Sequence, residues 1–213
     1  MDCYVYSPVS PIPAPSTDAI DIDACSYVHI KNCYFSVNDD GIALKGGKGP
    51  YADTVEENGS NERILIEDCF YNYCHGCLTC GSEAIHNKNI LLRRIKVNDA
   101  VNLLWLKMRP DTPQHYEWIT VDDASGHVEN FININPWTQF FDLKGRTDKP
   151  MSTVSNIEIK DCDCSCYQFF NVSSSRDYHL RSFSLKDLKI QAENKQNGYN
   201  SVEDISLENV TIE

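Results

Sequence analysis

The chain has 213 residues, 41% of them hydrophobic, and a formal net charge of −12 at pH 7. This length suits one domain with a sizeable core, and no stretch is long and apolar enough to cross a bilayer. The acidic residues are spread along the chain without a stripe of Lys and Arg, which argues against nucleic acid as a partner. We therefore expect a single domain over residues 1–213 without a membrane span.

The amino terminus shows no recognisable signal peptide, because Met1, Asp2 and Cys3 are not followed by a basic region and an apolar run. Such a start is compatible with a native cytosolic end and equally with a boundary behind an export signal. Four prolines follow between Ser7 and Pro15, and they cannot supply the backbone hydrogen bonds of a regular strand.

Three segments in the first half of the chain place a titratable group one step before a small residue and two steps before an apolar one; they cover residues 17–22, 39–44 and 74–79. Stacked by this pattern, they align Asp18, Asp40 and His75 in one column, with Asp39 beside it. Three carboxylates and a histidine at the starts of neighbouring strands suit proton transfer to a neutral bond. Asp is also favoured in turns, but the column favours catalysis over that explanation.

A repeated phrase determines the expected architecture. It reads apolar, any, apolar, any, a usually polar residue, then a small or apolar one, and its seven copies start at Val28, Ile64, Ile90, Ile119, Ile157, Phe183 and Ile205. Alternation within each copy predicts a strand, and the spacing of 22 to 38 residues is typical of a solenoid. Second strands are expected downstream, at residues 41–45, 103–107 and 168–172. Two or more short strands per turn describe an all-β fold, the parallel β-helix.

Ten cysteines raise the question of a metal site. The spacing of Cys74, Cys77 and Cys80 superficially suggests one, but a zinc site usually pairs two such knuckles. Alternating cysteines in strands more often pack as small buried hydrophobes. We therefore expect no metal and no other cofactor, and the sequence does not assign disulfides.

Side-chain alternation between Leu103 and Arg109 predicts a binding surface. If the leucines and Met108 point inwards, Trp105, Lys107 and Arg109 point outwards on one face. An indole beside two cations suits a sugar ring that carries a carboxylate. A solvated edge with ordinary Lys and Arg is the alternative, and the neighbouring acid column favours binding.

These residues resemble the polygalacturonase-like glycoside hydrolases of family 28. Members carry Asn-Thr-Asp-Gly, Asp-Asp, Gly-His-Gly and Arg-Ile-Lys in this order, and the chain has similar segments at residues 16–19, 39–40, 74–76 and 105–107. Residues 76–83 also look like the glycine-serine-glutamate segment that follows the family histidine. The resemblance covers nearly the whole chain. It implies a right-handed parallel β-helix that is secreted or periplasmic and hydrolyses galacturonic-acid-containing pectic chains.

The resemblance also implies roles in an inverting hydrolysis. Asp39 looks like the general acid, and Asp18 and Asp40 look like the side that holds and activates water. His75 would position or tune the acid, and Lys107 would pair with a uronate carboxylate. Crowding of three carboxylates is expected to raise the proton affinity of at least one of them.

Several departures limit the resemblance. Trp105 stands where the family has Arg, so carboxylate recognition is expected to be weaker, moved to Arg109, or directed at another sugar. Ala19 and Cys74 replace glycines, which requires that neither backbone has a positive φ. A family tyrosine has no counterpart in residues 136–141, and the Gly-rich stretch 45–61 is expected to form a wall of the cleft or a mobile surface loop.

Asp18 lies close to the start of the chain, so we expect the domain to lack amino-terminal coils of the family fold. Self-association through an open amino-terminal coil follows from this expectation. Two other functions remain open beside the hydrolase. One is a non-catalytic β-helix for carbohydrate binding or surface attachment, and the other is a polysaccharide lyase, which needs calcium ligands and a basic residue that abstracts a proton.

Overall fold

The computed structural model describes residues 3–213; Met1 and Asp2, which belong to the start predicted to carry no signal peptide, lie outside the described residues. Fourteen strands form one curled sheet in which every pairing is parallel. The described part contains two short 3₁₀ helices, and no helix there is long and apolar enough to span a membrane. The elements are β1 Cys3–Tyr6, β2 Ile20–Asp23, β3 His29–Lys31, β4 Cys33–Ser36, β5 Ile42–Lys45, η1 Ala52–Thr54, β6 Ser60–Glu67, β7 Phe70–Tyr73, β8 Gly76–Cys80, β9 His86–Val97, β10 Asn102–Met108, β11 His115–Pro136, β12 Ser152–Val172, β13 Tyr178–Asn197, η2 Tyr199–Ser201 and β14 Glu203–Ile212.

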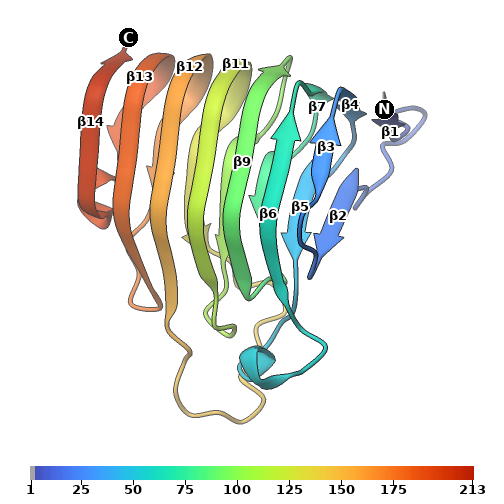
Figure 1. The fold of residues 1–213 in the computed structure, drawn as a ribbon, viewed down its shortest axis with the longest axis vertical. Coiled ribbons are helices and arrows are strands. Elements are labelled where there is room, and N and C mark those ends of the chain that lie inside the picture. Colours follow the sequence, from blue (N-terminus) through green and yellow to red (C-terminus); the bar gives the residue numbers. More distant parts are fainter. Residues whose placement is uncertain (1–2) are drawn as a thin grey trace.

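The strands stack into a parallel β-helix, as the repeated phrase predicts (Figure 1). The first residues of successive phrases are register partners: Ile64 pairs with Ile90, Ile90 with Ile119, Ile119 with Ile157, Ile157 with Phe183, and Phe183 with Ile205. These side chains are buried except in the last coil, where Ile205 is partly exposed. The spacing between successive phrases is therefore the number of residues in one coil of the solenoid.

A sharp corner of the backbone lies at each end of the phrase. The residue before the phrase and its fifth residue have φ between 50° and 60°. This left-handed conformation is costly for most residues and best tolerated by Asn and Asp, which explains the polar fifth position. The fifth residues are Asn32, Asp68, Arg94, Asp123, Asp161, Asp187 and Asn209. Asn or Asp thus fills six of these seven corners.

The second set of strands forms the face that carries the site. Along it, β2, β5, β8, β10 and the last third of β11 are neighbours in that order. β5 and β10 lie where second strands are predicted, and residues 168–172 are the end of the longer strand β12. Inward residues such as Leu44, Leu78 and Leu106 are fully buried in the common core.

The cysteines of the predicted metal spacing belong to this core. Cys74, Cys77 and Cys80 are fully buried and free, and the sulfur atoms of Cys74 and Cys77 are 3.9 Å apart. Burial raises the pKa of Cys77 and of Cys80, which disfavours the thiolate that would bind a metal. They pack as small hydrophobes.

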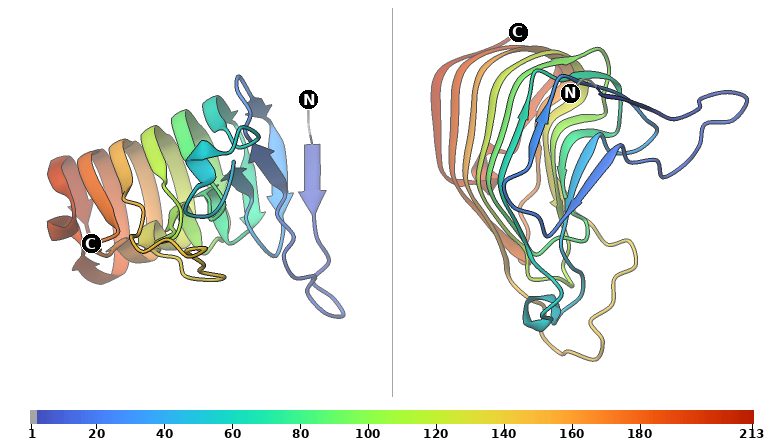
Figure 2. Two further views of the ribbon diagram at one scale, coloured as in Figure 1. Left: turned by 90° about the horizontal axis from the view of Figure 1, so that it is seen from below. Right: turned by 45° about the vertical axis from the view of Figure 1, so that its right-hand side comes forward.

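Two long loops meet on one side of the coil (Figures 1 and 2). Residues 46–59, which include η1, contact residues 137–151 through a hydrogen bond of 2.6 Å from Arg146 Nη1 to the Pro50 carbonyl. The ammonium of Lys48 also lies 5.2 Å from the centre of the Phe140 ring. The proline-containing segment between β1 and β2 instead extends away from the coils (Figure 2).

We expect amide hydrogen exchange to vary along the solenoid. β11 has strand neighbours on both sides, whereas β2 and β14 each pair with one strand among the described residues. Amides of Ile20–Asp23 and Glu203–Ile212 should therefore exchange faster than those of residues 119–134, as measured by NMR in dilute solution. Equal protection of edge and central strands would show that the edges are covered in solution.

Candidate active site

The acids, the histidine and the tryptophan of the predicted site come together on the outer face of neighbouring strands. Asp18 precedes β2, the Asp39-Asp40 pair precedes β5, and His75 precedes β8. Trp105 and Lys107 lie within β10. The side chains line a pocket of about 290 Å³ together with Ser16, Lys45, Ser82, Glu83, Trp137 and Gln139.

The register differs from the predicted column at one position. Asp18 stacks beside Asp40, whose backbone N–H donates a 3.1 Å hydrogen bond to Asp18 Oδ1. His75 stacks beside Asp39 instead of Asp40, and its N–H donates a 2.8 Å bond to the Asp39 carbonyl. Gly76 is thereby placed against Asp40. A Cβ atom on Gly76 would lie 2.0 Å from Thr79 Oγ1 and 3.0 Å from Asp40 Oδ1, so only glycine leaves this carboxylate its space.

Three carboxylates approach closely, as expected. One oxygen each of Asp18, Asp39 and Asp40 lies within 4.8 Å of the others. Asp40 is almost fully buried, and burial raises its pKa, with a smaller contribution from the charge of Asp18. The increase in proton affinity therefore falls on Asp40, and its main cause is burial. Lys45 and Lys107 compensate part of the charge of this cluster, at 3.4 Å from Asp18 and 2.7 Å from Asp40 respectively.

Asp39 and His75 form a more exposed pair, with His75 Nδ1 3.4 Å from Asp39 Oδ1. The hydrogen bond from His75 lowers the pKa of Asp39, and the same bond raises the pKa of His75. The general acid that the resemblance implies is therefore stabilised as a carboxylate in this structure. Asp40 is the acid whose pKa is raised.

This pair predicts a pH-dependent contribution to stability. Because the folded-state pKa of His75 is raised, the contribution of His75 to the free energy of unfolding is fully present below the ordinary pKa of histidine. This contribution is lost as the pH rises through the raised value. Because the pKa of Asp39 is lowered, its share is complete above the ordinary pKa of aspartate and is lost as the pH falls through the lowered value. Both contributions to the free energy of unfolding are fully present between about pH 4 and pH 6.5.

An NMR titration of the histidine ring measures this coupling. We expect the pKa of His75 to lie above the ordinary histidine value and to fall towards it in Asp39→Asn. An unchanged His75 titration in Asp39→Asn would show that the two side chains are not paired in solution.

Lys107 is held between a carboxylate and two indoles. Its ammonium lies 2.7 Å from Asp40 Oδ2, 4.0 Å from the centre of the Trp105 ring and 5.0 Å from that of Trp137. The two indoles meet edge to face, with ring centres 5.5 Å apart. The side chain of Lys107 is only 8% exposed. The predicted aromatic platform is present, and its cation is already paired.

The predicted outward, ligand-facing position of Arg109 is wrong. Its side chain is fully buried, because residues 139–142 of the long loop cover it. Both Nε and Nη2 donate 2.8 Å hydrogen bonds to Asp111. Nη2 also donates to the Phe140 carbonyl, and Nη1 donates to the Gln139 carbonyl. Alternation along β10 gave the correct side of the strand but carried no information about the loop that closes over its end.

Other expectations on the site residues can be compared directly. Ala19 and Cys74 both avoid positive φ, as the replacement of glycine requires. Of the stretch 45–61, Lys45 lines the pocket and residues 46–61 do not; Trp137 and Gln139 from the later loop form that wall, with residues 46–59 packed against their loop. Trp137 lies in residues 136–141, where the family tyrosine has no counterpart, and Ser82 and Glu83 belong to the glycine-serine-glutamate segment after His75. Lys45 was predicted only as the end of a strand and the first residue of the Gly-rich stretch, and neither pattern indicates a charged group in the pocket.

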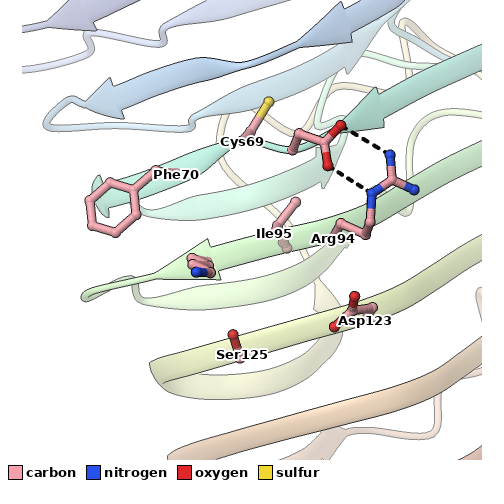
Figure 3. Close-up of a pocket in the computed structure, with 8 residues that line it drawn as sticks. Cys69, Phe70, Arg94, Ile95, Asp123 and Ser125 are labelled. Atoms are coloured by element: carbon pink, nitrogen blue, oxygen red, sulfur yellow. Dashed lines mark hydrogen bonds and ion pairs between the residues drawn. The ribbon is translucent and has the colours of Figure 1, made fainter.

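A second groove of about 450 Å³ lies along the corners of three coils, beside Phe70, Arg94 and Asp123 (Figure 3). Its main cation is already engaged, since Arg94 donates to Asp68 over 2.7 Å and to Glu67 over 2.6 Å. The groove is larger than the acid-lined pocket, but it lacks a comparable cluster of neighbouring carboxylates among the described residues. The chemistry is concentrated in the smaller pocket.

Fold and site together define a solenoid protein with an acid–base site on one outer face. The family "Glycosyl hydrolases family 28" matches residues 7–114, which is 108 of 213 residues. The chain therefore belongs to family 28, and the match contains Asp18, Asp39, Asp40, His75 and Lys107. No match was found among curated proteins.

Two solved structures resemble the chain. A hyperthermoactive exopolygalacturonase from Thermotoga maritima superposes with a TM-score of 0.58 at 18% identity, over 85% of this chain and 40% of that one. A family 28 exopolygalacturonase from Yersinia enterocolitica gives a TM-score of 0.48 at 16% identity, over 93% of this chain and 39% of that one. The first likeness supports the β-helix fold. The chain spans about two fifths of the length of these two proteins.

Proposed function

We propose that the protein is a glycoside hydrolase that acts on galacturonic-acid-containing pectic polysaccharides or oligosaccharides. The observation that carries the proposal is the pocket in which one oxygen each of Asp18, Asp39 and Asp40 lies within 4.8 Å of the others, with His75 against Asp39. Family membership supports the reaction class. Trp105 supplies a flat apolar surface for a sugar ring beside these groups.

In the proposed reaction, Asp39 donates its proton to the glycosidic oxygen as the bond to the anomeric carbon breaks. A water attacks that carbon and gives its proton to the carboxylate side formed by Asp18 and Asp40, so that one water is added across the bond. His75 positions Asp39 and returns a proton to it. Since His75 lowers the pKa of Asp39, we expect activity to rise as the pH falls from neutral, until the accepting carboxylates are protonated.

We propose inversion at the anomeric carbon on the basis of the family resemblance. The spacing of the carboxylates does not add support, because inverting pairs are usually about 6.5–9.5 Å apart and retaining pairs about 5–5.5 Å. Proton NMR during the first turnovers decides between them. We expect the opposite anomer to appear first and then equilibrate, and first appearance of the starting anomer would contradict inversion.

A screen of the 213-residue chain against pectic oligosaccharides tests the function itself. New reducing ends without near-ultraviolet absorbance are expected. Products that absorb there would indicate a lyase, and binding without any product would indicate a carbohydrate-binding β-helix. Secretion or periplasmic export and self-association through the amino-terminal coil belong to the same proposal, and the latter is measured by analytical ultracentrifugation over a range of concentrations.

A further inference from the structure

Trp105 and Trp137 form an indole wall of the pocket, and the charges around this wall bear on which sugar it binds. Four carboxylates line the pocket, those of Asp18, Asp39, Asp40 and Glu83. The lysines that line it are Lys45 and Lys107, and no arginine among residues 3–213 lines it. The carboxylates therefore outnumber the ammonium groups by two, and a protonated His75 reduces this excess to one.

Neither lysine is free to pair with a ligand. Lys107 contacts Asp40 and is covered by the two indoles, as described above. Lys45 lies 3.4 Å from Asp18 and 3.5 Å from Asp21. Burial opposes the charge of Lys45, but the neighbouring carboxylates together, with Asp18 and Asp21 first among them, outweigh burial and raise its pKa. Arg109, the remaining nearby cation, is fully buried, pairs with Asp111 at 2.8 Å and lies 3.9 Å from Glu83.

The surface beyond the indoles is neutral as well. On the next coil, Asn133 is the register partner of Trp105, and Asn135 is the partner of Lys107. One coil further, Asn171 pairs with Asn133, and the Ser173 hydroxyl donates a 2.6 Å hydrogen bond to Asn135 Oδ1. Amides and a hydroxyl offer hydrogen bonds to sugar hydroxyls, but they provide no charge for a carboxylate.

We infer that the ring bound at Trp105 and Trp137 is an uncharged pyranose, either a neutral sugar of a galacturonate-containing chain or a methyl-esterified galacturonate. The inference rests on the proposed function and specifies its substrate. A free carboxylate at this position meets an excess of like charge and no unpaired cation. An uncharged ring meets the apolar surface of the indoles, which stand nearly perpendicular to each other, and a row of neutral hydrogen-bonding groups.

Binding of trigalacturonate and of its full methyl ester, measured by calorimetry at low salt on wild type and on Asp39→Asn, tests the inference. We expect the ester to bind about tenfold more tightly, the effect of one like-charge contact, and added salt to reduce this preference. Tighter or equal binding of the free acid, or no binding of either ligand, overturns the inference.

Trp105→Arg supplies the missing cation, so it should reverse the preference in favour of the acid. Trp118→Arg is the matched control, because Trp118 is 53% exposed and does not line this pocket; it should leave the preference unchanged. A preference that Trp105→Arg leaves unaltered counts against the inference. Product formation is measured separately. Hydrolysis with a preference for the acid supports the proposed function and rejects the uncharged ring. Selective binding of the ester without hydrolysis supports the uncharged ring and rejects the proposed function.

Discussion

Asp39→Asn should reduce hydrolysis of pectic oligosaccharides by at least about 10²–10⁴-fold, the usual contribution of a positioned general acid. Asparagine has nearly the same shape but carries no transferable proton. The Asp39 side chain is 27% exposed, so its replacement leaves the core untouched, and the fold and substrate binding should remain. Steady-state kinetics and calorimetric binding on the same preparation measure the two effects separately.

Asp23→Asn is the control for this variant. Asp23 is an exposed acid on β2, the strand that follows Asp18, and it does not line the pocket. Its replacement should leave turnover unchanged. Wild-type turnover in Asp39→Asn would reject Asp39 as the general acid. Asp40, whose pKa is raised, would then be the next candidate for that role.

Asp111→Ala should lower the free energy of unfolding by about 3–5 kcal/mol, because it leaves the buried guanidinium of Arg109 without its partner. Both side chains are at most 1% exposed, and Asp111 also accepts a 2.9 Å hydrogen bond from the backbone N–H of Asp142. The loss therefore loosens the loop that brings Trp137 to the pocket. Urea unfolding gives the stability, and indole fluorescence reports the loop.

Asp148→Ala provides the comparison on the same loop. Asp148 pairs with Arg146 at 2.8 Å, but its side chain is 70% exposed. Exposed pairs contribute about 0–1 kcal/mol, so this variant should change stability little. Similar losses in both variants would mean that the Arg109–Asp111 pair is accessible to water in solution.

The coil was predictable because each of its features is local in the sequence. Alternation identifies the strand, and the Asn or Asp at the fifth position identifies the corner, since these residues tolerate a left-handed backbone. Seven repetitions of the phrase then define the stacking. The grouping of Asp18, Asp39 and His75 follows from that stacking, because parallel register transfers sequence position directly into spatial neighbourhood.

The surroundings of these groups were not predictable in the same way. The burial of Arg109 depends on residues 139–142, which have no repeat and no alternation to align. Trp137 reaches the pocket from the same loop, so its role could not be inferred from the pattern. The shift of His75 from Asp40 to Asp39 is a register difference of one residue, and a pattern of small and apolar residues cannot resolve it.

Because the site is stacked on successive coils, the spacing of its residues is independent of the shape of the surrounding loops. Neighbouring parallel strands lie about 4.8 Å apart, so backbone hydrogen bonds fix the axial steps between Asp18, Asp40, Gly76 and Asn102. The loops between strands can lengthen or shorten without changing these steps. In the proposed hydrolase, the loop of residues 137–151, which brings Trp137 and Gln139 to the pocket, can therefore change while the axial steps between Asp18, Asp40 and Gly76 stay constant.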